Sequence, residues 1–181
     1  MLVKEARSRY DREHMEIILL PDGIRLKGKS ANLSVNSTKD ISSYQAFLSL
    51  TKLDSLPASN MLMIDGAGEY EVAGVKISTL AAEQELVYTL AIDSIIISVG
   101  TLSALEKLHS KLPESQVVIV DATVDGNPAF VASIATAAVV FTGMFGKSAG
   151  EKVAKTSLQS MNKFVITADK LPTELQTIHL T

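Results

Sequence analysis

Residues 66–78, with the sequence GAGEYEVAGVKIS, predict a β-hairpin from which the rest of the fold can be worked out. Ala73 and Gly74 separate two runs in which polar and apolar side chains alternate. A two-residue turn of this kind joins antiparallel strands and fixes which residues face one another. The expected cross-strand pairs are Val72 with Val75, Glu71 with Lys76, and Tyr70 with Ile77.

The segments around this hairpin predict a chain that begins with short strands and then alternates strand and helix. Residues 1–13 are a charged leader or arm, and a single domain is expected over residues 14–181. Before the hairpin we expect strands at 15–20, 23–28 and 31–36 and a short helix within 37–60. After it we expect strands at 86–92, 94–99, 116–122, 137–141, 163–169 and 175–180, with helices at 101–112, from Asn127 onward, and at 148–161.

The composition is that of one globular domain whose core is built mainly from aliphatic side chains. The chain has 181 residues, of which 46% are hydrophobic and 5% aromatic. The absence of cysteine excludes disulfides, thiolate metal sites and a cysteine nucleophile, so a cytoplasmic location is expected. The net charge of −3 comes from interspersed signs and offers no broad positive field, so we expect no nucleic-acid partner.

The uncharged stretch 126–146 approaches the length that a membrane-spanning helix needs. Polar residues interrupt it, and it divides into a helix capped by Asn127 and Pro128 followed by a β-branched strand. We therefore expect no membrane partner.

The stretch GAGEYEVAGVKI resembles a branch of the metallo-β-lactamase superfamily, the hydrolases related to the L-ascorbate-6-phosphate lactonases. That branch carries a Gly-Pro-Gly-Glu-Tyr-Glu stretch before a short apolar strand, and here Ala67 replaces the proline. Residues 15–36 and 164–180 resemble its opening strands and its closing strand, in the same order. The resemblance implies a four-layer αββα sandwich. The matching residues are Gly66, Gly68, Glu69, Tyr70, Glu71, Val72, Gly74 and Val75.

The metal ligands of that family are missing from the corresponding positions. The family has a His-x-His-x-Asp-His loop where residues 40–61 contain no histidine, and its later histidines fall near Ser98 and near Gly143 and Met144. Its early Gly-His-Ser turn corresponds to residues 20–22. Such ligands hold zinc and lower the pKa of a bound water to about 7. Without them we expect no metal, no other cofactor and no zinc-hydrolase activity.

Other chemistry receives weaker support from the sequence. His14, His109 and His179 show no metal-ligand spacing, and the segment 143–148, GMFGKS, lacks the glycine spacing of a phosphate-binding loop. Carboxylates at strand ends could gather at one edge of the sandwich, although Asp-Gly pairs are also ordinary turns. These carboxylates are Asp65, Asp121 and Asp125.

The sequence therefore favours a non-catalytic domain that acts as an interaction or assembly module, with a protein partner or a homo-oligomer. The former active-site mouth, with Ala46, Phe47 and Leu48, is expected either to be filled or to form a contact surface. The alternative is a metal-independent hydrolase, or a protein that binds a phosphorylated sugar or a nucleotide. This alternative would use hydroxyls and carboxylates near Ser98, Thr101 and Asp121.

Overall fold

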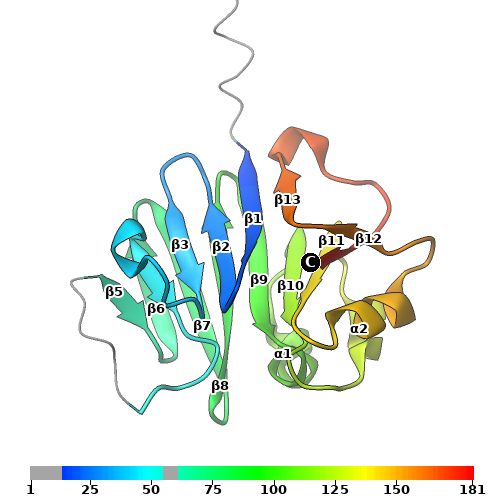
Figure 1. Cartoon of the computed structure of the whole chain (residues 1–181), viewed down its shortest axis with the longest axis horizontal. Helices are drawn as coiled ribbons and strands as arrows, with labels where there is room; N and C mark the ends of the chain where they lie inside the picture. Colours follow the sequence, from blue (N-terminus) through cyan, green and yellow to red (C-terminus); the bar gives the residue numbers. More distant parts are fainter. Residues whose placement is uncertain (1–13, 55–60) are drawn as a thin grey trace, which may run out of the picture.

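The computed structural model describes residues 14–54 and 61–181, so the charged leader lies outside the described residues. Two mixed β-sheets pack face to face, and the two described α-helices lie on the outside of the eight-stranded sheet (Figure 1). Strands of the two sheets bury their apolar faces against each other, and this shared interior holds the larger core, from Met15 to Leu180. The architecture confirms the predicted fold of metallo-β-lactamase type.

The first sheet has the strand order β13-β1-β2-β3-β4-β5. Strands β1, β2 and β3 form the expected antiparallel meander, and β4 and β5 add to it in parallel. The bounds are β1 Met15–Leu20, β2 Gly23–Lys27, β3 Asn32–Val35, β4 Ala46–Leu48, β5 Leu62–Ile64 and β13 Lys163–Ile166.

The second sheet has the order β12-β14-β11-β10-β9-β8-β7-β6. Strands β6 to β9 are antiparallel neighbours, whereas β9, β10, β11, β14 and β12 run parallel. The bounds are β6 Gly68–Val72, β7 Val75–Ala82, β8 Glu85–Ile92, β9 Ile95–Thr101, β10 Val117–Asp121, β11 Ala138–Thr142, β12 Gln159–Met161 and β14 Gln176–Leu180.

The two α-helices cover the outer face of this second sheet. Helix α1 (Leu102–Leu108) packs on β7, β8 and β9, and α2 (Gly146–Val153) packs on β11 and β14. Their buried side chains form a second core with the outer residues of the parallel strands. Four short 3-10 turns complete the described chain: η1 Ile41–Ser43, η2 His109–Lys111, η3 Pro128–Ser133 and η4 Ala168–Lys170.

The predicted hairpin has the expected register, with Val72 opposite Val75, Tyr70 opposite Ile77 and Glu71 opposite Lys76. Ala73 and Gly74 have φ angles of 50° and 78°, which are the left-handed values that a tight two-residue turn requires.

Three helix predictions need correction. The helix expected within 37–60 is wrong for the described residues, because 46–48 form strand β4 between two parallel neighbours. A short apolar run fits either a helix or a buried strand, and here burial on both faces selects the strand. The helix expected at 148–161 begins at Gly146, ends at Val153 and is followed by β12. The segment after Asn127 is the 3-10 turn η3.

Candidate functional site

The chain that follows β4 occupies the place where the resemblance puts the first metal-binding loop. It is fastened to the turn between β7 and β8 by main-chain hydrogen bonds. The N–H of Leu86 donates to the carbonyl of Leu50, and the N–H of Lys52 donates to the carbonyl of Gln84, both at 2.8 Å. Thr51 and Glu85 form an antiparallel bridge between these two contacts. This end of the sandwich is therefore closed by backbone pairing between the two sheets.

Tyr88 fills the interior immediately behind this closure. Its side chain is fully buried, and its hydroxyl lies 2.6 Å from the carbonyl oxygen of Ser49 and 2.7 Å from that of Ile64. Burial raises the pKa of Tyr88 far above the ordinary value, so its hydroxyl stays protonated and acts as a donor. A β8 side chain thus bridges two strands of the opposite sheet.

Ala46, Phe47 and Leu48, which the sequence predicted at a mouth of the sandwich, do not form a contact surface. All three are buried, because β4 lies between β3 and β5 in the first sheet. The early turn at residues 20–22 is also structural. The hydroxyl of Ser37 donates to Asp22 at 2.5 Å, and this hydrogen bond lowers the pKa of Asp22.

A small pocket of about 190 Å³ opens beside this closure, where β9 and β10 end and α1 begins. Thr101 and Asp121 lie at these strand ends and are register partners in the parallel ladder. The structure therefore brings together two of the three residues that the sequence suggested. The pocket lining is Glu85, Thr101, Leu102, Ser103, Glu106, Asp121, Thr123, Val124, Asp125 and Gly126.

The polar groups of this pocket are largely bonded to one another. Thr101 donates to the Glu85 carboxylate at 2.6 Å and accepts from the N–H of Ala104 as the N-cap of α1. Ser103 also donates to Glu85. The carboxylate of Asp121 accepts from the N–H and the hydroxyl of Thr123, at 3.1 and 2.5 Å. These bonds hold the strand ends in place.

Ser98 does not belong to this pocket. Its side chain is buried, with its hydroxyl 2.8 Å from that of Ser115 and 3.2 Å from that of Thr89. These contacts tie β9 to β8 and to the residues before β10. Ser98 therefore helps to hold neighbouring strands together, although it is only three residues before Thr101 in the chain.

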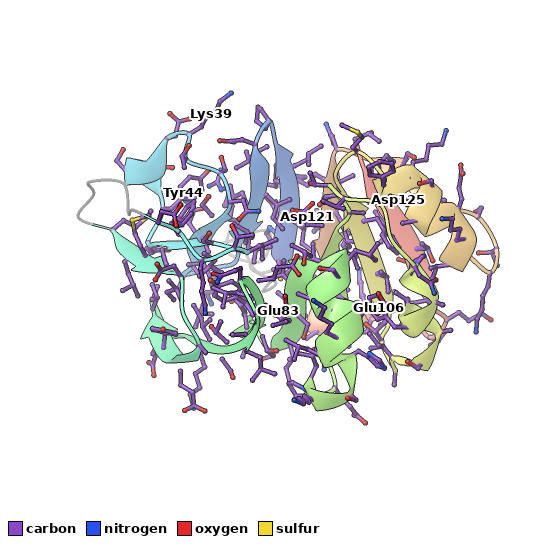
Figure 2. All side chains as sticks on the ribbon, turned by 90° about the horizontal axis from the view of Figure 1, so that it is seen from below. Lys39, Tyr44, Glu83, Glu106, Asp121 and Asp125 are labelled. Carbon is purple, nitrogen blue, oxygen red and sulfur yellow. The ribbon has the colours of Figure 1, made fainter. Side chains whose placement is uncertain are left out.

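The carboxylates expected at strand ends gather only in part. Asp121 and Asp125 both line the pocket, whereas Asp65 follows β5 and is not among its lining residues. Figure 2 shows Asp121, Asp125 and Glu106 around the α1 end of the molecule. The sequence reading missed Glu85 and Glu106, whose side chains complete the acidic lining. Glu85 could have been noticed at the polar break that separates two apolar strands.

The three histidines lie on separate elements. His14 is 3.4 Å from Glu16 at the start of β1. The Nδ1 atom of His109 donates to the carbonyl of Glu106 at 2.7 Å, and its ring packs against Phe130. Within residues 14–54 and 61–181, no three histidine, aspartate or glutamate side chains are grouped so that they could hold a metal ion.

The pocket at Thr101 and Asp121 is lined by four carboxylates and three hydroxyl groups, and no lysine, arginine or histidine lines it. Its charge suits an organic cation or a neutral hydroxylated molecule and repels phosphate. None of the helices in the described part of the chain is long and apolar enough to span a membrane.

A crystal structure from Thermotoga maritima has a similar fold. It is assigned to the Zn-dependent hydrolases of the metallo-β-lactamase superfamily. The alignment covers 92% of this chain and 98% of that one, with a TM-score of 0.67 and 14% sequence identity. No family model matches the sequence, and no curated protein matches it significantly. At this identity, the similarity shows that the chain has the metallo-β-lactamase fold.

Proposed function

We propose that this chain is a non-catalytic domain of metallo-β-lactamase type, derived from the branch related to the L-ascorbate-6-phosphate lactonases, and that it acts as a protein-interaction or assembly module. The observation that carries the proposal is the closure behind β4. Where the family's first ligand loop would lie, Leu50 is buried and paired with β8, and the Tyr88 hydroxyl bonds the Ser49 carbonyl. A water-activating metal needs an open coordination position, and buried apolar side chains with a neutral phenol do not supply one.

The first experiment measures metal content. Protein purified without chelator is challenged with Zn²⁺, Mn²⁺ and Fe²⁺, desalted and analysed by elemental analysis. The proposal expects less than about 0.1 equivalent of any metal, because a structural or catalytic zinc site binds tightly enough to survive desalting. Stoichiometric metal would overturn the non-catalytic reading and return the search to hydrolase activity.

The second experiment addresses assembly. Size-exclusion chromatography with light scattering over a hundredfold range of protein concentration measures the mass of the chain in solution. A stable dimer or higher oligomer supports an assembly role, and a monomer directs the search to a different protein partner. A monomer for which crosslinking and affinity capture also yield no specific partner contradicts the module.

The alternative function is binding of a small ligand in the pocket of Thr101 and Asp121. Its carboxylates favour cationic or polyhydroxylated ligands over the phosphorylated sugars and nucleotides that the sequence suggested. Thermal-shift measurements with matched phosphorylated and unphosphorylated sugars, polyamines and nucleotides separate these classes, because a ligand that binds only the folded state raises its apparent stability. A shift that disappears in Asp121→Asn would support the alternative.

A further inference from the structure

Among residues 14–54 and 61–181, strand β6 forms an edge of the eight-stranded sheet and pairs with β7 alone. The two-residue turn at Ala73 and Gly74 makes Val72 and Val75 the first hydrogen-bonded pair. In an antiparallel ladder the hydrogen-bonded pairs alternate. The main-chain groups of Glu69 and Glu71 therefore point away from β7, where an added strand could bond them.

The side chains of this edge carry a regular pattern. Glu69 and Glu71 are both exposed on the outer face of the sheet, while Tyr70 and Val72 are half-buried against the core. Neither glutamate has an ion-pair partner among residues 14–54 and 61–181, although Lys76 lies directly opposite Glu71 on β7. The edge thus presents two unpaired negative charges two residues apart.

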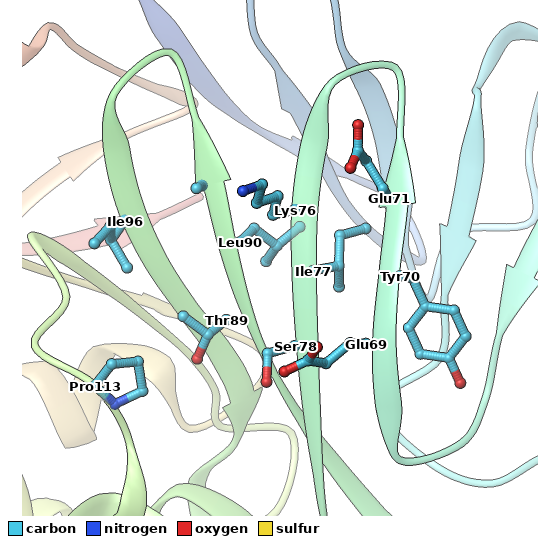
Figure 3. Close-up of a pocket in the computed structure, with 11 residues that line it drawn as sticks. Glu69, Tyr70, Glu71, Lys76, Ile77, Ser78, Thr89, Leu90, Ile96 and Pro113 are labelled. Carbon is cyan, nitrogen blue, oxygen red and sulfur yellow. The ribbon is translucent and has the colours of Figure 1, made fainter.

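The outer face beside this edge is hollowed. A pocket of about 550 Å³ extends from Glu69 and Glu71 across β7 and β8 to Ile96 and Pro113 (Figure 3). Ser78 and Thr89 place hydroxyl groups along its middle. The volume lies within the range of ligand sites, and the hollow leaves room beside β6 for long side chains from an added strand.

We propose that β6 binds an extended basic segment of a partner protein by strand addition. Arginine or lysine at alternate positions of the segment faces Glu69 and Glu71. The residue between them is apolar or aromatic and packs beside Tyr70. The partner pattern is therefore basic, apolar, basic. This proposal rests on the interaction role proposed above and specifies its surface.

Charge complementarity selects this occupant over a second copy of the strand. If β6 paired with β6 of another copy, glutamates would face glutamates across the new ladder, and like charges in that position are destabilising. The same two charges protect an edge strand from self-association. A basic segment turns this repulsion into attraction.

The test uses a fluorescent peptide, Gly-Arg-Val-Arg-Tyr-Gly, and measures its binding by anisotropy at low salt. One control peptide has the same composition with adjacent arginines, Gly-Arg-Arg-Val-Tyr-Gly. A second carries N-methyl groups on the amides that would bond β6. The alternating peptide should bind at least about tenfold more tightly than either control, because strand addition needs both the spacing and the main-chain donors.

The protein variant is E69K/E71K, and its matched control is E83K/E174K, which makes the same change in net charge on exposed residues outside β6 and its hollow. The first variant should weaken the arginine peptide by about tenfold or more and gain binding to Gly-Glu-Val-Glu-Tyr-Gly. The control should change neither affinity. Equal loss in both variants, or equal binding of both arginine peptides, would show a diffuse charge effect and overturn the proposal. Circular dichroism verifies that each variant is folded.

Two outcomes separate this proposal from the proposed function. If the chain binds a metal stoichiometrically, the non-catalytic role fails whatever the peptides do. If the chain assembles or holds a partner equally well with E69K/E71K, the interaction role stands and β6 is the wrong surface. Self-association that E69K/E71K abolishes would make the occupant a second copy and contradict the basic partner.

Discussion

The hydroxyl of Tyr88 on β8 lies 2.6 Å from the carbonyl oxygen of Ser49, which directly follows β4 in the opposite sheet. The same hydroxyl lies 2.7 Å from the carbonyl of Ile64, at the end of β5. A single buried hydroxyl therefore lies within hydrogen-bonding distance of two carbonyl oxygens on the side of the first sheet. This contact links the stability of the sandwich to the proposed loss of its metal site.

Tyr88→Phe should lower the free energy of unfolding by about 1–3 kcal/mol, because it removes the buried hydroxyl that lies against the Ser49 carbonyl, whereas the Ile64 carbonyl still accepts from the N–H of Ser49 at 3.0 Å. Urea denaturation followed by circular dichroism measures this change. Tyr70→Phe is the matched control, since the Tyr70 hydroxyl is only half-buried and bonds Gly66 at 3.2 Å. A Tyr88→Phe effect no larger than that of the control would mean that the bridge contributes little.

Replacing Gly23 and Gly74 by alanine should distinguish destabilisation by a steric clash from destabilisation by an unfavourable backbone conformation. A Cβ atom at Gly23 would lie 2.2 Å from the carbonyl oxygen of Val35 and 2.6 Å from the nitrogen of Ser37, and both are backbone atoms that cannot move aside. At Gly74 the Cβ meets nothing within 4 Å, but φ is +78°. We expect Gly74→Ala to cost about 1 kcal/mol and Gly23→Ala to cost more than about 2 kcal/mol, measured as denaturation midpoints. The reverse order would contradict the packing of β2 on β3.

Thr101→Val should destabilise the domain by about 1 kcal/mol, because it removes the N-cap of α1 and the hydrogen bond to Glu85. Thr101→Ser keeps both bonds and should be nearly neutral. The pair is compared by thermal unfolding. If both substitutions are neutral, the hydrogen bonds of Thr101 do not stabilise the domain. Thr101 would then be examined as a residue that binds a ligand.

Protonation of His179 should make the folded domain less stable in mild acid. Burial and then the charge of Lys147 lower the pKa of His179, whose ring lies under Gly146 at the start of α2. A lowered pKa means that the unfolded chain takes up the proton first as the pH falls below about 6.5. Stability is therefore fully present above that pH and declines as the pH falls toward the folded-state pKa.

The measurement is the urea midpoint of the wild type and His179→Gln between pH 8 and pH 5. Both proteins share the contributions of all other groups, so the difference between their curves reports His179. The wild type should lose more stability than His179→Gln over this range. Parallel curves would contradict the assignment.

The local features of the chain could be predicted from its sequence. The hairpin register at Val72 and Val75 follows from a two-residue turn and the alternation of its flanks, so the prediction was correct in every pair. The strand and turn order from β1 to β3 was predicted for the same reason. The helix expected within 37–60 was wrong because the apolar run at 46–48 has no period that separates a short helix from a strand buried on both faces.

Two features of the site depended on tertiary structure. Thr101 and Asp121 meet because β9 and β10 are parallel neighbours, whereas Ser98 faces Ser115 and Thr89 outside the pocket. Glu85 reaches the same pocket from the start of β8.

The sequence by itself determined the hairpin, the resemblance to the metallo-β-lactamase fold and the missing histidines, since each of these depends on short stretches of the chain or on simple counts. Only the tertiary structure decided that the chain after β4 is paired with β8 and that the Tyr88 hydroxyl fills the space behind it. The physical reason is that this hydrogen bond joins Ser49 and Tyr88, which belong to different sheets. No local periodicity or spacing predicts which buried donor will bond which distant carbonyl.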